Sequence, residues 1–214
     1  MTRCFAMLIG LLGAGLASVA MPANAERRQV DLIVEGAQMV TMDPERPLIL
    51  DGAVAIDAGA IVGVARRAAI HRDFEGREVI QGKDRVLMPG LVNGHTHAAM
   101  VLFRGLADDL DLMTWLTKVI FPMEGRFVDA DFVATGARLA CWEFIRGGTT
   151  TVVDMYFHPE VSAQEFESCG LRAILGAPMI DYPSPGFEGW DDSHAAGRRF
   201  AAQWTDRNGR IRPA

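Results

Sequence analysis

Two histidines separated by a single residue are the feature of this sequence best suited to chemistry. His95 and His97 follow an apolar run that contains Pro89 and Gly90. Side chains alternate between the two faces of a β-strand, so residues i and i+2 project to the same side. Two imidazoles on one side can bind the same metal ion, and this geometry suits zinc. A His-x-His pair also occurs as two ordinary surface or core histidines, but its position after an apolar strand favours metal binding.

The elements that must position this pair alternate between strands and helices. We expect strands at residues 86–92, 149–157, 171–180 and 210–213, and helices between Asp129 and Gly147 and at residues 159–168 and 193–204. Asp129 is a typical N-cap and Gly147 a typical helix end. Strands that are apolar on both faces, each followed by a helix, indicate a parallel sheet with right-handed crossovers. The fold class predicted for residues 86–214 is therefore α/β.

Residues 26–85 have a different pattern. Short β-rich runs at residues 32–34, 53–56 and 61–64 are separated by Asp, Gly and Pro turns, and residues 57–60 are typical of a hairpin turn. A unit of ~55 residues buries little surface by itself. We expect a small all-β unit that needs a partner surface.

The first 25 residues are typical of a secretory signal peptide. Arg3 precedes a long apolar run, and Ala23-Asn24-Ala25 supplies the small-x-small cleavage pattern. The apolar run is shorter than the ~20 residues that a membrane-spanning helix needs. We therefore expect export to the periplasm or the extracellular space, with no stable membrane span after cleavage.

Charge and cysteine content narrow the function classes. The net charge of −6 is spread along the chain without a basic cluster, which argues against a nucleic acid polymer as partner. Cys141 and Cys169 lie on expected helices. A disulfide between them is permitted outside the cytosol, but we expect two small buried residues, because cysteine is among the most buried residue types.

Several motifs together resemble the amidohydrolase superfamily. They are Met88-Pro-Gly-Leu-Val-Asn-Gly-His-Thr-His-Ala-Ala-Met100, Leu102-Phe-Arg-Gly-Leu-Ala-Asp-Asp109, Trp115-Leu116 and Gly147-Gly-Thr-Thr-Thr-Val-Val-Asp-Met-Tyr156. The resemblance covers nearly all of residues 30–214. It is closest to the methylthioadenosine and S-adenosylhomocysteine deaminase branch, and guanine and chlorotriazine hydrolases are nearby branches.

This resemblance implies a (β/α)8 TIM barrel with a small β-sandwich domain, and a divalent metal at the C-terminal face of the barrel. His95 and His97 match the paired metal ligands of the first barrel strand. By their spacing, Trp115 and Glu124 match a pocket tryptophan and a glutamate that binds ribose hydroxyls. The alternatives are core packing for Trp115 and a solvated charge for Glu124.

Three further residues need separate interpretations. Asp154 could face the site at the end of its strand, but we expect it to have a structural hydrogen-bonding role. His158 is expected in the loop that follows the same strand. Neither His158 nor His194 is expected to complete the metal site.

The resemblance also places the general base and the remaining ligands after residue 214, so the catalytic residues are unknown from this sequence. A complete barrel takes ~250 residues, and residues 86–214 supply about three strand–helix units. We expect a signal peptide at 1–25, the first part of a β-sandwich at 26–85 and a truncated barrel at 86–214. An exposed half barrel would be poorly soluble or would associate into a homo-oligomer.

The expected activity follows from the metal. Zinc lowers the pKa of its bound water to ~7, which supplies hydroxide to attack the carbon that bears an amino group. We expect a hydrolase of carbon–nitrogen bonds other than peptide bonds. It would deaminate a small adenosine-like or other purine or heterocyclic substrate, with one zinc or another divalent transition metal per active site. The alternatives are a guanine or chlorotriazine hydrolase and an inactive fragment.

Overall fold

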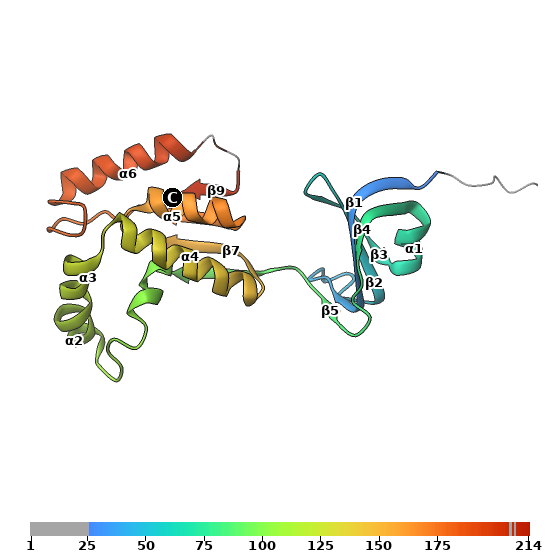
Figure 1. The fold of residues 1–214 in the computed structure, drawn as a ribbon, viewed down its shortest axis with the longest axis horizontal. Helices are drawn as coiled ribbons and strands as arrows, with labels where there is room; N and C mark the ends of the chain where they lie inside the picture. Colours follow the sequence, from blue (N-terminus) through green and yellow to red (C-terminus); the bar gives the residue numbers. More distant parts are fainter. Residues whose placement is uncertain (1–25, 206, 208) are drawn as a thin grey trace, which may run out of the picture. The chain divides into compact units, whose positions relative to one another are not determined.

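The computed structural model describes residues 26–205, 207 and 209–214 (Figure 1). The chain divides into two compact units, and the boundary in the sequence is between Pro89 and Gly90. The expected signal peptide at residues 1–25 lies outside the described residues. No helix in the described ranges is both long enough and apolar enough to cross a lipid bilayer.

The first unit is a mixed β-sheet with one short helix. Its elements are β1 (Arg28–Val40), β2 (Leu48–Asp57), β3 (Ala60–Arg66), α1 (Arg67–Asp73), β4 (Phe74–Ile80) and β5 (Val86–Leu87). The sheet order is β3-β2-β1-β4, and β5 also pairs with β1. Strand β1 is antiparallel to β2 and parallel to β4 and β5. A small core of Val30, Ile33, Ala53, Ala55 and Ile70 lies within this unit.

The expected hairpin turn at residues 57–60 is confirmed. Asp57 pairs with Ala60, and the two residues between them, Ala58 and Gly59, have φ angles of 48° and 76°. Two successive positive φ angles are typical of the tight turn that matches the twist of a hairpin. Helix α1 was not expected, because its seven residues bury only Ile70 and carry no long apolar repeat.

The strand expected at residues 86–92 is wrong. Val86 and Leu87 pair with β1 in the first sheet, whereas Leu91 starts β6 in the second sheet. Pro89 between them has no N–H to donate to a strand partner. A Cβ on Gly90 would lie only 2.2 Å from the Thr150 side chain, so this position needs glycine for close approach. One apolar run in the sequence therefore serves two separate sheets.

The second unit contains an all-parallel sheet with helices between its strands, and it has the predicted α/β class. The sheet order is β6 (Leu91–Thr96), β7 (Thr149–Met155), β8 (Arg172–Gly176) and β9 (Ile211–Pro213). The main helices are α4 (Ala130–Arg146), α5 (Pro159–Cys169) and α6 (Trp190–Trp204). Figure 1 shows these three helices alongside the sheet. Buried residues from the sheet and the helices form a large core, which includes Val152, Phe166, Leu175 and Trp204. A smaller buried cluster includes Tyr156 and Phe157.

Helix ends in this unit follow the expected signals. The Asp129 carboxylate accepts a hydrogen bond from the backbone N–H of Phe132 at 2.8 Å and so caps α4. Gly147 directly follows Arg146, the last residue of α4, as expected. Gly170 ends α5 in the left-handed conformation with a φ of 84°. Between β6 and α4 lie four short elements. They are η1 (Ala98–Phe103), α2 (Leu112–Thr114), the π-helix η2 (Trp115–Ile120) and α3 (Phe121–Phe127).

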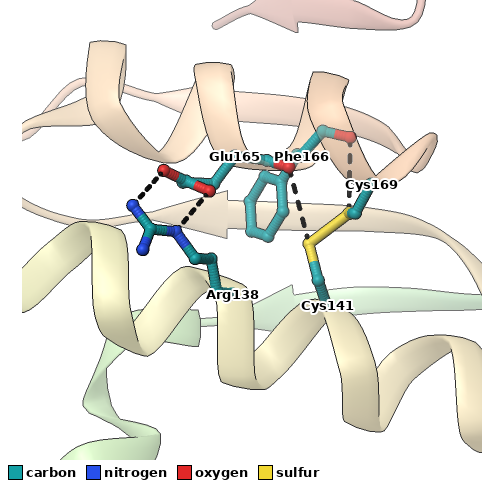
Figure 2. The surroundings of a disulfide bond; sticks show 5 residues. All are labelled: Arg138, Cys141, Glu165, Phe166 and Cys169. Atoms are coloured by element: carbon teal, nitrogen blue, oxygen red, sulfur yellow. Dashed lines mark hydrogen bonds and ion pairs between the residues drawn. A yellow bond between two sulfur atoms is a disulfide. The ribbon is translucent and has the colours of Figure 1, made fainter.

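The two cysteines form a disulfide, so the expectation of two unpaired buried residues is wrong. Cys141 on α4 bonds to Cys169 on α5, with their Cα atoms 6.4 Å apart (Figure 2). Arg138 also joins the two helices through both oxygens of the Glu165 carboxylate, at 2.9 and 3.0 Å. The packing of α4 on α5 brings the cysteines together, and their separation of 28 residues could not reveal it.

Candidate metal centre and substrate cavity

The two histidines lie at the carboxyl end of strand β6. His95 is within the strand, and His97 immediately follows its last residue, Thr96. The two imidazole rings are 5.0 Å apart between centroids and meet edge to face at 78°. Thr96 pairs with Asp154 of β7, so the carboxyl ends of the two neighbouring strands lie together. Carboxyl ends of parallel strands are where α/β proteins place their sites.

One hydrogen bond determines the tautomer of His97. Its Nδ1 lies 2.5 Å from the backbone oxygen of Met155. A carbonyl oxygen can only accept, so in neutral His97 the proton is on Nδ1 and the Nε2 lone pair is free. Metal-binding histidines typically donate their second N–H to such a partner, which orients the ring. The Nε2 atom of His97 is therefore available to bind a metal ion.

Asp154 supports the turn that carries His97. Its side chain is only 2% exposed, and its Oδ1 accepts a hydrogen bond from the Ala98 backbone N–H at 2.8 Å. Burial raises the pKa of Asp154 to about 6, although the Ala98 N–H and the nearby His97 act in the opposite direction. The predicted structural hydrogen-bonding role of Asp154 is confirmed.

Glu124 is a buried carboxylate, and the alternative of a solvated charge is wrong. Its side chain on α3 is 7% exposed, and the Tyr156 hydroxyl donates a hydrogen bond to its Oε1 at 2.9 Å. Burial raises the pKa of Glu124, while the Tyr156 hydrogen bond and the nearby His97 oppose this shift. Burial and the Glu124 charge raise the pKa of Tyr156, so its hydroxyl remains a donor. The second carboxylate oxygen of Glu124 has no recorded side-chain partner among the described residues.

A cavity of about 190 Å³ brings three of the four predicted site residues together. His97, Trp115 and Glu124 all line it, and most of the remaining wall is apolar. Trp115 begins the π-helix, a rare element that is frequent at functional sites. Sequence reasoning missed Tyr156, which directly follows the last residue of β7 and comes two residues after Asp154.

The remaining candidates lie elsewhere. His158 precedes α5 with a φ of 51° and lies 3.7 Å from the Glu160 carboxylate, and His194 stacks on Trp190. Within the described ranges, no three His, Cys, Asp or Glu side chains gather in a way that could hold a metal ion. The described residues therefore offer two histidines, His95 and His97, as candidate metal ligands.

Comparisons with known proteins agree with this arrangement. Residues 86–212 match the model of the amidohydrolase family. The chain is 41% identical to a 5-methylthioadenosine/S-adenosylhomocysteine deaminase of Syntrophus aciditrophicus over 82% of this chain and 40% of that protein. A crystal structure of an adenosine deaminase from Xanthomonas campestris, with bound zinc, has a TM-score of 0.85 and 39% identity over 88% of this chain and 43% of that one.

A more distant structure shares the fold alone. Guanine deaminase from C. acetobutylicum, with guanine in its active site, has a TM-score of 0.70 at 21% identity, over 85% of this chain and 44% of that one. The chain spans about 40% of the length of the curated relative described above.

Proposed function

This chain belongs to the amidohydrolase family, and we propose that it provides the metal-binding histidines and part of the substrate pocket of a zinc-dependent nucleoside deaminase. The observation that carries the proposal is the shared cavity of His97, Trp115 and Glu124. It combines an imidazole that could hold a metal, a flat apolar wall and a buried carboxylate. These could activate water, contact the purine ring and bind the ribose hydroxyls of an adenosine-like substrate.

The two histidines are suitable ligands for zinc. His95 and His97 present imidazoles at one strand end, and the Met155 carbonyl leaves Nε2 of His97 free. Catalytic zinc usually has three protein ligands, so these two are part of a larger set. Bound zinc supplies Lewis-acid activation of water near neutral pH. The relative with bound zinc supports this choice of metal.

The residues of this chain would then bind and orient the substrate. Glu124 has one oxygen occupied by the Tyr156 hydroxyl, and we propose that the other accepts the ribose hydroxyls. Trp115 would lie against the purine ring, and the apolar wall would exclude water from the reacting carbon. Asp154 would not contact the substrate. It would help to position His97, because its carboxylate accepts a hydrogen bond from the backbone N–H of the next residue, Ala98.

We extend the proposal to the whole fold. Strands β6 to β9 would be the first four strands of a (β/α)8 barrel, since they are parallel and adjacent in chain order. The mixed sheet of residues 26–89 would be part of a small β-sandwich domain.

Export to an oxidising compartment is a further part of the proposal. The Cys141–Cys169 disulfide supports it, because disulfides form and persist mainly outside the cytosol. The sequence pattern of residues 1–25 points the same way. The N-terminal residue of the protein purified from its source cells tests this, and retention of residues 1–25 in a cytosolic fraction would contradict it.

The activity is tested with purified, zinc-loaded protein by ammonia release from the amino-bearing compounds and by chloride release from the chlorotriazine. The panel contains adenosine, 5′-deoxyadenosine, 5′-methylthioadenosine, guanine and a chlorotriazine. We expect the adenine nucleosides to be the best substrates. Turnover of guanine or the triazine alone would replace the proposal with the related hydrolase activity, and no turnover of any compound would reject it.

A further inference from the structure

Two consecutive residues at the end of β7 contact two different parts of the proposed site. The Met155 carbonyl accepts the hydrogen bond from Nδ1 of His97. The next residue, Tyr156, donates its hydroxyl to the Glu124 carboxylate on α3 at 2.9 Å. One short segment of backbone therefore orients a candidate metal ligand and also contacts the carboxylate that we propose binds ribose.

The Glu124 carboxylate depends on this contact. Its side chain is 7% exposed, and among the described residues no Lys or Arg forms an ion pair with it. Burial without a cation disfavours the charged form and raises the pKa of Glu124, and the hydrogen bond from Tyr156 opposes that shift. A glutamate side chain also has several rotatable bonds, so an unpaired carboxylate would be poorly oriented.

Tyr156 itself has a fixed position. Its side chain is 4% exposed, and its ring packs edge to face on Phe157 with the centroids 5.2 Å apart. The two rings belong to a buried cluster that also contains Ala99, Val128 and Val133. Burial and the Glu124 charge raise the pKa of Tyr156, so the hydroxyl keeps its proton. It can therefore act as a rigid donor to Glu124.

We infer that Tyr156 is a positioning residue, which acts on the substrate through Glu124 by holding one carboxylate oxygen so that the other can bind the ribose hydroxyls. This inference rests on the proposed function. Loss of the Tyr156 hydroxyl would loosen the ribose contact and leave the two histidines and the apolar wall in place. A hydrogen bond to a charged group is strong enough for an effect of about tenfold on affinity.

The first test compares Tyr156→Phe with the unmodified protein, both loaded with zinc. Phenylalanine keeps the ring in its buried cluster and removes only the hydroxyl. We expect KM for adenosine to rise about tenfold, with kcat within about threefold. KM for 2′,3′-dideoxyadenosine, which lacks both ribose hydroxyls, should stay within about twofold.

A second tyrosine provides the matched control. Tyr182 is the other tyrosine of the sequence and is 49% exposed, so Tyr182→Phe should change neither KM value. An equal rise for both nucleosides in Tyr156→Phe would overturn the inference, because it would show that the hydroxyl supports the cavity in general. An unchanged KM for adenosine would also overturn it.

A double variant tests whether Tyr156 acts through Glu124. Glu124→Ala removes the whole carboxylate, so adding Tyr156→Phe to it should change KM for adenosine by less than about twofold. A further rise of about tenfold in the double variant would show that Tyr156 has a role of its own, and would overturn the inference.

Binding of inosine, the product of adenosine deamination, separates this inference from the proposed function. Inosine and 2′,3′-dideoxyinosine cannot be deaminated, and titration calorimetry with the zinc-loaded protein measures their Kd. We expect Tyr156→Phe to weaken inosine binding about tenfold and dideoxyinosine binding by less than about twofold. This selective loss in a protein that deaminates nothing would reject the activity and keep the positioning role. Equal effects on the two ligands would reject the positioning role even in an active deaminase, and no binding of inosine to the unmodified protein would reject both.

Discussion

The two units use the same kinds of side chain for different purposes. In the first unit, His71 lies 2.7 Å from Glu35, and the exposed pairs Arg28–Asp57 and Arg77–Asp31 hold neighbouring segments at 2.8 and 2.9 Å. In the second unit, a histidine and a glutamate line one cavity, and neither is used in an ion pair among the described residues. Residue type alone does not separate these roles.

The arrangement of the strands explains the difference. In the first unit, antiparallel neighbours deliver carboxyl ends to both edges of the sheet, so polar side chains pair locally across the strands. In the second unit, every strand is parallel and every carboxyl end reaches the same edge. Loops from distant parts of the chain therefore meet beside β6, and their polar groups face a shared space.

The largest expected difference between the two units comes from replacing one histidine in each of them. His97→Ala should reduce zinc content to background and turnover by more than about a hundredfold, because it removes a ligand whose ring is already oriented. His71→Ala is the matched control and should keep both zinc and turnover. Metal analysis and ammonia release check this, and full zinc at full activity in His97→Ala would contradict the assignment.

Reduction of the disulfide should have the next largest effect, and only in the second unit. Opening a loop of 28 residues between Cys141 and Cys169 should lower the free energy of unfolding by about 3 kcal/mol. Urea titrations of Cys141→Ser, and of the unmodified protein with and without a thiol reductant, measure it. The first unit has no cysteine among its described residues and should not respond. A midpoint unaffected by reductant would refute the bond.

Replacing the buried Glu124 of the second unit and the half-buried Glu35 of the first should give a smaller contrast. Glu124→Gln keeps an oxygen for the Tyr156 hydroxyl but removes the charge that we propose binds ribose. We expect kcat/KM for adenosine to fall about 10- to 100-fold, mostly through KM. Glu35→Gln disrupts the contact with His71 and should leave KM within about twofold. Equal KM values in the two variants would remove Glu124 from the binding site.

The smallest effect is expected at the exposed ion pairs of the first unit. Arg77→Gln breaks the contact with Asp31, but both side chains are well exposed, at 74% and 45%. Water and salt screen such pairs, so the Tm should stay within about 2 °C of the unmodified value. Thermal unfolding followed by circular dichroism measures this. A larger drop would mean that the first unit depends on its surface charges.

Much of the fold could be predicted because its signals are local. The Asp129 cap, the Gly147 helix end and the Ala58–Gly59 turn act over a few residues, and the structure has all three. The strand at residues 86–92 failed because a continuous apolar run carries no mark of where one sheet ends and the next begins. Pro89 and Gly90 were the residues that could have indicated a break between the two strands.

The candidate site divides in the same way. His95 and His97 lie at the same strand end, so their spacing alone suggested that both could bind one metal ion. The contact of Tyr156 with Glu124 spans 32 residues, and the disulfide spans 28. No periodicity within a strand or helix records contacts at such separations.

The sequence by itself determined the α/β class of the second unit, the hairpin of the first and the placement of His95 and His97 at the end of β6, because these depend on neighbours in the chain. Only the tertiary structure decided that Glu124 is buried beside His97 and that Cys141 meets Cys169. These features depend on which helix faces pack and where loops from different strands converge. That choice is made by burial of the whole core rather than by any local run of residues.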